Sequence, residues 1–592
     1  MSNYAPPLDD INFCLRHLSG IDEILSLDAF DGIEVADLEQ IIGEAGRFAR
    51  DVIAPTNVIG DQQGVRLEDG KVLVPDAIAD LHAQFVANGW QSVAGNPEFG
   101  GMGLPSAVAN AVSEMVETGN LAYSLLPMLT HDGAIALEAH GTEEQKARFL
   151  SKLITGEWSG TMLLTEPQAG SDLAAVKTRA VPDGDRYRIF GTKIFITWGD
   201  HELSENIIHF VLARVEGAPE GVRGISMFLV PKFEVGDDGA IGERNDVRAT
   251  SVEHKLGIHV SPTCVMSFGD DDGAIGYLLG EENKGLANMF TMMNHARLGV
   301  GLQGLAVSER AYQQACAYAN DRVQGKAPGV EGRAPIIHHA DVRRMLMLMR
   351  SQIEAMRAVA YSAAAEIDQS HHASGEETRQ AAEARLSLLT PIVKGWCTEK
   401  SEEITSLGVQ IHGGMGYVEE TGAAQHYRDA RILTIYEGTS GIQANDFAGR
   451  KTLGDEGREL GRLIAELREM AQELGNQQGL GDVAKSISEG LDLLEKGARW
   501  IVDKAMSHPA AVGAAAFNYM MLAGTVLGGA YLAKAAGIAS SDESVDEEFA
   551  AAKRATSAFY CAHVLPRAHG YLAAMTADPG ITMAIPAEAF AD

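Results

Sequence analysis

The chain has 592 residues, of which 46% are hydrophobic and 22% are charged, and its formal net charge is -33. A single hydrophobic core does not grow to this size, so we expect two to four domains. The acidic excess argues against broad binding of nucleic acid or of an anionic membrane surface, because both are polyanionic.

The cysteines are scattered without a C-x-x-C pair, at Cys14, Cys264, Cys316, Cys397 and Cys561. This spacing argues for a reducing compartment and against a zinc or iron–sulfur site. The pairs His338-His339 and His371-His372 belong to no metal-ligand motif, so no metal site is predicted. The first residues include prolines and acids where a signal peptide needs basic and apolar residues, and we therefore expect a cytoplasmic protein.

Residues 1–157 predict an N-terminal helical domain. Apolar residues recur at helical spacing over 35–52, 75–88 and 106–118, with glycine and proline between these runs. Thr142, followed by Gln145 three positions later, has the pattern of a capping box, which marks the start of a helix.

A change to strand-like patterning after Trp158 predicts a middle, mainly antiparallel β domain over 158–282. Polar and apolar residues alternate over 186–190 and over 193–197, and Gly191-Thr192 between these runs predicts a hairpin.

Helical patterning returns at Gly285 and predicts a C-terminal helical bundle over 283–452, followed by an additional helical domain over 453–592. Within that last domain, residues 510–533 contain no charged side chain and are long enough to cross a bilayer. They are mainly Ala and Gly, however, which favour membrane insertion far less than Leu or Ile. We therefore expect a buried helix packed through small side chains and no membrane span.

The first cluster of candidate functional residues is Leu-Thr-Glu-Pro-Gln-Ala-Gly-Ser-Asp at 164–172, where the strand-like patterning begins. Small residues let a backbone approach a ligand closely, and Thr165 and Ser171 supply hydroxyl donors. A capped turn with no ligand is the alternative interpretation.

The second cluster is Gln-Ile-His-Gly-Gly-Met-Gly-Tyr at 410–417. Adjacent glycines expose backbone N–H groups, which can bind a pyrophosphate. The run is not a dinucleotide-binding fingerprint of the βαβ kind, because no strand precedes it. A Gly-rich turn between two helices remains the alternative.

The third cluster is Arg-Asp-Ala-Arg at 428–431, followed by Ile-Tyr-Glu-Gly-Thr at 435–439. A lone glutamate on a loop is usually a solvated charge. The apolar residues that precede Glu437 predict partial burial, where the pKa of a carboxyl group rises toward the range of a general base.

Together, in this order and on a helix–β–helix plan, the three clusters resemble the signature regions of the acyl-CoA dehydrogenase family, over roughly residues 36–447. The resemblance implies a mainly α fold with a central β domain. In that fold a helical domain, a β-barrel or sandwich domain and a helical bundle bind FAD, and the additional C-terminal helical domain extends this plan.

The resemblance also implies that Glu437 removes the α-proton of an acyl-CoA thioester, while FAD takes the β-hydrogen as hydride and a trans-2-enoyl thioester forms. Some family members have their base on a helix instead, directly before an Arg. The matching position here is Ala296, before Arg297. Alanine cannot accept a proton, which leaves Glu437 as the base.

The resemblance implies the remaining site residues as well. The predicted FAD contacts are Met162, Thr165, Ser171, Phe195, Thr197, Arg322, Gln410, Gly413, Gly414 and Thr439. The predicted substrate contacts are Ser171, Asn294, Arg297, Tyr436 and Gly438. Arg322 is expected to reach FAD from a neighbouring subunit, so a homodimer is predicted. For Arg297 the alternative is a cation on a helix surface.

The extra C-terminal region and the runs at 4–10, 253–259 and 518–534 resemble the enlarged bacterial 3-methylmercaptopropionyl-CoA dehydrogenase subgroup. That subgroup implies 3-(methylthio)propanoyl-CoA as the substrate, in dimethylsulfoniopropionate degradation, and electron-transferring flavoprotein as the acceptor. Three alternatives stay open. They are a short- or medium-chain acyl-CoA dehydrogenase of β-oxidation, an acyl-CoA oxidase that uses dioxygen, and a cofactor-free helical binding protein.

Overall fold

The computed structural model describes residues 4–505 and 509–590, which divide into two compact units. Among these residues, unit 1 comprises 47–105 and 115–299. Unit 2 comprises 4–46, 106–114 and the described residues from 300 onward. Three helices contain residues of both units, namely α3 (Val35–Phe48), α6 (Ser106–Gly119) and α10 (Gly285–Asp321).

Unit 1 combines short helices with a β-sheet. Its helices are α4 (Thr56–Gln63), α5 (Asp76–Ala87), α7 (Leu121–His140), α8 (Glu143–Gln145) and α9 (Ser151–Thr155). Its strands are β1 (Arg66–Glu68), β2 (Lys71–Leu73), β3 (Trp158–Leu163), β4 (Arg179–Asp183), β5 (Arg186–Thr197), β6 (Asn206–Val215), β7 (Ile225–Pro231), β8 (Phe233–Val235), β9 (Ile241–Arg244), β10 (Val247–Val252), β11 (Thr263–Phe268) and β12 (Ala274–Leu278).

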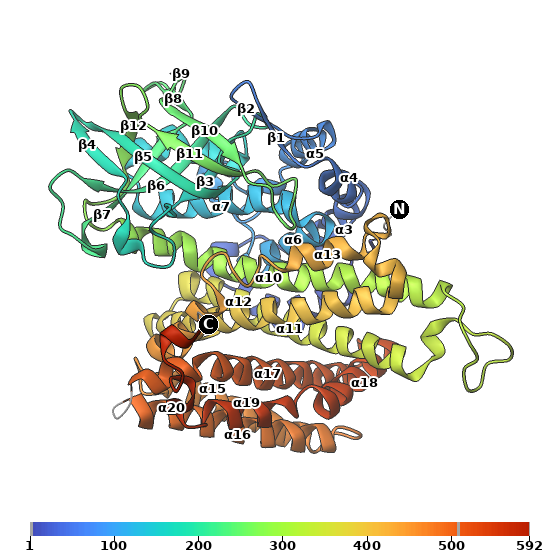
Figure 1. Ribbon diagram of the computed structural model, residues 1–592. Helices are drawn as coiled ribbons and strands as arrows, with labels where there is room; N and C mark the ends of the chain where they lie inside the picture. The colour runs from blue at the N-terminus through green and yellow to red at the C-terminus, as the bar shows by residue number, and fades with distance from the viewer. Residues whose placement is uncertain (1–3, 506–508, 591–592) are drawn as a thin grey trace. The chain divides into compact units, whose positions relative to one another are not determined.

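Eight of these strands form one sheet in the order β10-β11-β5-β12-β7-β6-β3, and β4 pairs with both β5 and β6. The pairs β3–β6 and β4–β6 are parallel, and the others are antiparallel. Helix α7 lies along this sheet (Figure 1), because small residues allow a close approach. A Cβ on Gly133 would lie 2.5 Å from the Phe210 ring.

The predicted hairpin at Gly191-Thr192 is wrong, because β5 continues through it as one strand of 12 residues. The two halves of β5 have different partners. Gly191 and Thr192 pair with Phe268 and Ser267 of β11, while the first half pairs with β4 and β12. A Cβ on Gly191 would lie 2.5 Å from Thr178 Oγ1, so this glycine permits a close approach rather than a turn.

Unit 2 is helical. Besides the shared helices it contains α1 (Leu8–His17), α2 (Ile21–Leu25), α11 (Ala340–His372), α12 (Glu376–His412), α13 (Ala423–Ala430), α14 (Ser440–Asn445), α15 (Arg458–Leu474), α16 (Gly481–Ala505), α17 (Pro509–Ser541), α18 (Glu547–His563), α19 (Arg567–Met575) and α20 (Pro579–Thr582). Helices α16, α18 and α19 all pack against α17 (Figure 1).

In unit 1, the predicted capping box of Thr142 and Gln145 is confirmed at the start of α8.

The Ala/Gly-rich run lies in α17, the helix that contains the one described segment long and apolar enough to cross a membrane. In the structure, 67% of its most apolar window is buried. Gly524 and Gly528 pack against Trp396 of α12, which is fully buried. The apolar composition of α17 is thus accounted for by packing within unit 2, as expected from its small residues.

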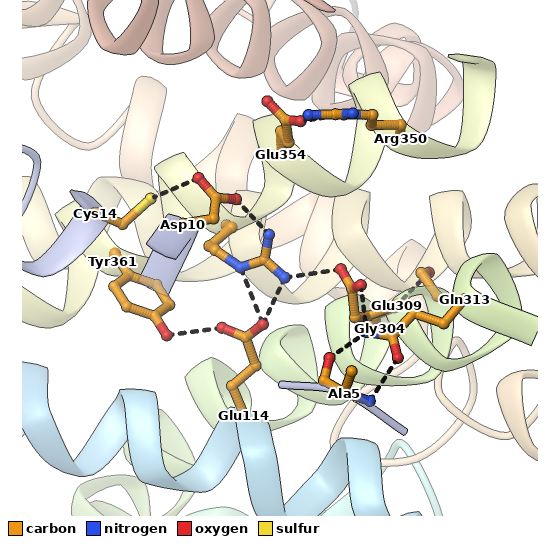
Figure 2. Close-up of polar contacts among 12 residues, drawn as sticks. Ala5, Asp10, Cys14, Glu114, Gly304, Glu309, Gln313, Arg350, Glu354 and Tyr361 are labelled. Carbon is orange, nitrogen blue, oxygen red and sulfur yellow. Dashed lines mark hydrogen bonds and ion pairs between the residues drawn. The ribbon is translucent and has the colours of Figure 1, made fainter. Parts of the chain in front are cut away.

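A buried cluster of charges around Arg357 of α11 connects α1 to the rest of unit 2. Figure 2 labels three members of this cluster, Asp10, Glu114 and Glu309. The guanidinium of Arg357 lies 2.6 Å from Asp10 of α1, 2.7 Å from Glu114 and 2.9 Å from Glu309. Asp10 also lies 2.5 Å from Lys553 of α18. These residues are far apart in the sequence, so the cluster joins the two ends of the chain to its middle.

Candidate functional site

Glu437 lies in the loop between α13 and α14 of unit 2, and its side chain is half-buried. Its backbone φ is 54°, in the left-handed region that residues other than glycine rarely adopt. Such a conformation costs about 1–3 kcal/mol and persists only where the surroundings enforce it. The position of this carboxylate therefore depends on the contacts of its loop.

Lys394 supplies the central contact. This lysine of α12 is fully buried, and its Nζ donates hydrogen bonds to the carbonyl oxygens of Leu433 at 2.8 Å and Gly438 at 2.7 Å. Gln443 of α14 donates a further hydrogen bond, of 3.1 Å, to the carbonyl oxygen of Glu437 itself. The loop is thus fastened on both sides of Glu437.

Side chains of α10, α12 and α14 complete the support of this loop. Tyr436 donates a short hydrogen bond to Gln303, which is fully buried in α10. Ser440 donates to Glu399 of α12 at 2.5 Å, and Thr439 accepts the N–H of Ile442 as the N-cap of α14. The loop is less buried than its apolar sequence suggests, since 47% of Ile435 is exposed.

The Gly-rich cluster at 410–417 begins in the last turn of α12, which ends at His412. Gly413 has a φ of 61° and ends the helix, and a Cβ placed on Gly413 or Gly414 would meet nothing within 4 Å. Both glycines and Gln410 are exposed. The ring of His412 stacks on that of Tyr318, with their centroids 4.5 Å apart, and this contact holds the end of α12 against α10. The open glycine backbone is suited to an anionic ligand.

Arg322 directly follows α10 and is exposed. Among the residues that the structure describes, no ion pair involves its guanidinium. Its carbonyl oxygen accepts the N–H of Ile336 at 2.8 Å, so the backbone at this position is held. An exposed guanidinium of this kind is available to a phosphate group.

In unit 1, the loop at 164–172 is built around a buried ion pair. Glu166 lies 2.8 Å from Lys193 of β5, and its carboxylate also accepts hydrogen bonds from Lys177 N and from Thr178 N and Oγ1. Burial alone would raise the pKa of Glu166, but Lys193 and these hydrogen bonds lower it to about 2. The ion pair therefore shapes a loop whose Ser171 is exposed and whose Thr165 is half-buried.

The predicted FAD contacts of β3 and β5 lie close to this loop. The N–H of Ile194 donates to the carbonyl oxygen of Thr165 at 2.9 Å, and Thr161 donates to that of Thr197 at 2.6 Å. Phe195 has a φ of 59° and 60% of it is exposed. The structure thus bonds the Thr165 loop and the β3 strand to the same stretch of β5, in which Phe195 is exposed. Met162 lies within β3 and is buried.

Asn294 and Arg297 lie on α10, in the part of that helix that belongs to unit 1. Arg297 is only 4% exposed, so it is not a cation on a helix surface. Its Nη1 lies 3.4 Å from Asn294 Oδ1, and its guanidinium lies 5.8 Å from the centre of the Phe290 ring. Ala296, at the alternative base position, is fully buried.

Sequence reasoning missed the residues that position these loops. Lys394 is the clearest case, and a signal was present, since it is a single lysine within the apolar run 388–397. Lys193 occupies an ordinary polar position of an alternating strand, where nothing in the sequence indicates burial. Each of them acts on a loop distant in sequence.

Four family models match the chain. Residues 36–157 match the N-terminal domain of acyl-CoA dehydrogenase, 161–270 its middle domain and 283–451 its C-terminal domain. Residues 443–586 match a domain described as acetyl-CoA dehydrogenase C-terminal like.

Several curated relatives align over nearly the whole chain, among them the following two. The 3-methylmercaptopropionyl-CoA dehydrogenase of Ruegeria pomeroyi is 46% identical, covering 95% of this chain and 96% of its own length. A broad-specificity linear acyl-CoA dehydrogenase of Mycobacterium tuberculosis is 33% identical, covering 96% of each chain. The solved structure of Caenorhabditis elegans ACDH-11 in complex with C11-CoA has a TM-score of 0.75 at 20% identity, covering 95% of this chain and 93% of that one.

Proposed function

The chain belongs to the acyl-CoA dehydrogenase family, which makes it a flavoprotein oxidoreductase with FAD as its cofactor. From this premise we propose that it oxidises 3-(methylthio)propanoyl-CoA to the trans-2-enoyl thioester, with Glu437 as the base. The observation that carries the assignment of the base is the enforced conformation of Glu437, whose loop is fastened by Lys394 and Gln443.

In the proposed reaction Glu437 accepts the proton from the α-carbon of the thioester. The C–H electron pair forms the α,β double bond. When bound, FAD would supply the two-electron acceptor for the β-hydrogen, which leaves as hydride. The contacts of the loop hold the backbone of Glu437 in place, which lowers the entropic cost of bringing its carboxylate to the α-carbon. Its backbone N–H is proposed to donate to the thioester carbonyl, so that one residue removes the proton and stabilises the resulting negative charge.

The residues present fit a flavin dinucleotide. An exposed aromatic ring, Phe195, offers a flat apolar surface beside the Thr165 and Thr197 segments of unit 1. In unit 2, the open backbone of Gly413-Gly414 can bind a pyrophosphate, and the exposed guanidinium of Arg322 can pair with a phosphate. All of the predicted FAD contacts, Ser171, Gln410 and Thr439 among them, remain predictions.

The methylthio substrate is supported by the relative from Ruegeria pomeroyi, since 46% identity extends over nearly both whole chains. The broad-specificity relative supports the competing assignment, a dehydrogenase of linear short- or medium-chain acyl-CoA. Anaerobic reduction of the bound flavin by a panel of acyl-CoA esters decides between them. We expect 3-(methylthio)propanoyl-CoA to give the highest kcat/KM, and a higher value for any unsubstituted ester would contradict the substrate assignment.

Electron-transferring flavoprotein is proposed as the acceptor, with acyl-CoA oxidase as the alternative activity. The two differ in where the electrons go after the reduction step, so the assay compares turnover with this flavoprotein against consumption of dioxygen. A reduced flavin that dioxygen reoxidises at the rate of turnover would favour the oxidase.

We propose a homodimer because the family resemblance has Arg322 reach FAD from a neighbouring subunit, and Arg322 is exposed. Analytical ultracentrifugation of the FAD-loaded protein measures its oligomeric state.

A cytoplasmic location is proposed because the five cysteines are free thiols. Detection of the protein in cell fractions tests this proposal.

A further inference from the structure

A long loop of unit 1, which connects β10 to β11, has no role in the reaction described above. It spans 253–262 and includes the run 253–259, one of those that resemble the enlarged subgroup. Lys255 Nζ donates to the carbonyl oxygen of Ser261 at 2.9 Å, so the loop folds on itself. Ile258 is buried and has a φ of 47°, which a β-branched residue rarely adopts. Such a conformation persists only where surrounding contacts enforce it.

One side chain fastens this loop to α4. His259 Nδ1 lies 2.9 Å from Oδ1 of Asp61 and 3.0 Å from the carbonyl oxygen of the same residue. Beside it, a Cβ on Gly60 would lie 2.8 Å from Val260, so this glycine lets the loop come close to the helix. Only 27% of the His259 side chain and 12% of the Asp61 side chain are exposed. The contact is therefore partly shielded from water.

The second ring nitrogen of His259 faces an oxygen as well. Nε2 lies 3.0 Å from the carbonyl oxygen of Lys255, whose own ammonium group bonds to Ser261. A neutral imidazole has one N–H donor and one lone pair, so one of its nitrogens would face an oxygen without a proton. An imidazolium donates from both nitrogens, and the carboxylate of Asp61 on α4 balances its charge. The contacts of His259 therefore favour the doubly protonated ring.

The far end of the loop holds a turn at the end of β5. The carbonyl oxygen of Pro262 accepts the N–H of Trp198 at 2.7 Å, and Thr263 pairs with Thr197. Trp198 is fully buried and has a φ of 52°, and Phe195 in the same stretch has a φ of 59°. Two strained residues so close together depend on what surrounds them. Part of that surrounding is the end of the loop 253–262.

We propose that His259 is an imidazolium and a positioning residue, which fastens the loop 253–262 to Asp61 of α4. Through this loop it fixes the turn that carries Phe195 and Thr197. The inference rests on the proposed function in taking these two residues as FAD contacts. Raising the pH removes the second proton and leaves one ring nitrogen without a donor. The fastening is therefore strongest at low pH and weakens as the pH rises.

The protonation of His259 is tested by 15N NMR of the FAD-loaded protein, labelled at histidine. The two ring signals of His259 are assigned by their loss in His259→Gln. Both nitrogens should carry a proton at pH 7, where an ordinary histidine, with a pKa of about 6.5, is mostly neutral. An unprotonated ring nitrogen at pH 7 would overturn the proposal.

The positioning role is tested by the rate at which FAD leaves the diluted holoenzyme, followed by flavin fluorescence. His259→Leu should release FAD about two- to ten-fold faster than the wild type at pH 6, the range of a single modest hydrogen bond. This ratio should fall toward 1 at pH 9, where the wild type has lost the second proton too. Asp61→Asn should act in the same direction, because the imidazolium loses its counter-charge. His254→Leu changes an exposed neighbour in the same loop, and as the matched control it should leave the rate unchanged.

A ratio that stays constant from pH 6 to pH 9, or that equals 1 throughout, would overturn the positioning role. Should His259→Leu fail to fold, Asp61→Asn provides the same comparison. No acyl-CoA enters these measurements, so a wild type that binds FAD but is reduced by no acyl-CoA ester would contradict the proposed function alone. A wild type that does not bind FAD would contradict both.

Discussion

The ammonium group of Lys394 lies 2.7 Å from the carbonyl oxygen of Gly438, the residue that follows Glu437. The lysine belongs to the middle of a 37-residue helix and is fully buried, while Glu437 belongs to a short loop in a strained conformation. A buried cation hydrogen-bonded to two carbonyl oxygens thus determines where the proposed base stands. The position of the proposed base therefore depends on the loop of Glu437 and on α12 together.

Glu437→Gln should retain FAD and bind acyl-CoA, but reduce its flavin about 100- to 10,000-fold more slowly, because an amide cannot accept the α-proton. Stopped-flow absorbance under anaerobic conditions measures the rate. Glu456→Gln is the matched control. Glu456 is an exposed loop glutamate with a φ of 59°, and its replacement should leave the rate unchanged. Reduction at nearly the wild-type rate in Glu437→Gln would remove Glu437 from the mechanism.

Lys394→Met should lower both stability and activity. The buried Leu433 carbonyl loses its donor, which costs about 1–3 kcal/mol in the free energy of unfolding. The loop then relaxes, and we expect flavin reduction to slow by about 10- to 100-fold, since small displacements of a catalytic group have effects of this size. Urea unfolding and stopped-flow reduction measure the two effects.

Lys400→Met provides the comparison, because Lys400 is also buried in α12 but lies 3.5 Å from Glu403 rather than against the loop. It should lower stability and leave the rate of reduction unchanged. A similar loss of rate in both variants would indicate that Lys394 acts through general stability and not through the loop.

Asp10→Asn should reveal a pH-dependent contribution of the buried charge cluster. Burial opposes ionisation, but Lys553 and Arg357 lower the pKa of Asp10 from 3.8 to about 2. A carboxyl group whose pKa is lower in the folded state stabilises the fold above its unfolded pKa, and this stabilisation is lost as pH falls from about 4 to 2. The contribution at neutral pH is about 2 kcal/mol.

Unfolding free energies of the wild type and of Asp10→Asn, measured from pH 7 down to pH 3, should therefore converge as the pH falls below 4. Asp9→Asn changes an exposed neighbour on the same helix and should shift stability by no more than about 0.5 kcal/mol. A difference between wild type and Asp10→Asn that stays constant with pH would argue against an ionised, paired Asp10.

Two alanine substitutions in α17 should have opposite signs. A Cβ on Gly524 would lie 2.2 Å from the Trp396 ring, and overpacking of this kind costs about 1–3 kcal/mol. A Cβ on Gly513 would meet nothing within 4 Å, so Gly513→Ala should stabilise by about 0.5–1 kcal/mol through helix propensity. Thermal unfolding measures both. Equal tolerance of the two would mean that α17 does not pack on Trp396.

Sequence by itself determined the features whose signal is local. Helix periodicity, the capping box of Thr142 and Gln145, and the small-residue packing of α17 all follow from residues within one or two turns. The assignment of Glu437 came from its signature residues. The structure adds that the backbone of Glu437 adopts a left-handed conformation.

Tertiary structure decided what depends on partners distant in the chain. Gly191 resembles a hairpin turn in the sequence, and only its close approach to Thr178 shows why β5 continues through it. Lys394, Asp10 and Asp61 are ordinary charged residues until their partners are known. A buried charge is stable only when opposite charges or hydrogen-bonding groups surround it. In this chain those groups come from other helices and loops, and hence only folding brings them together.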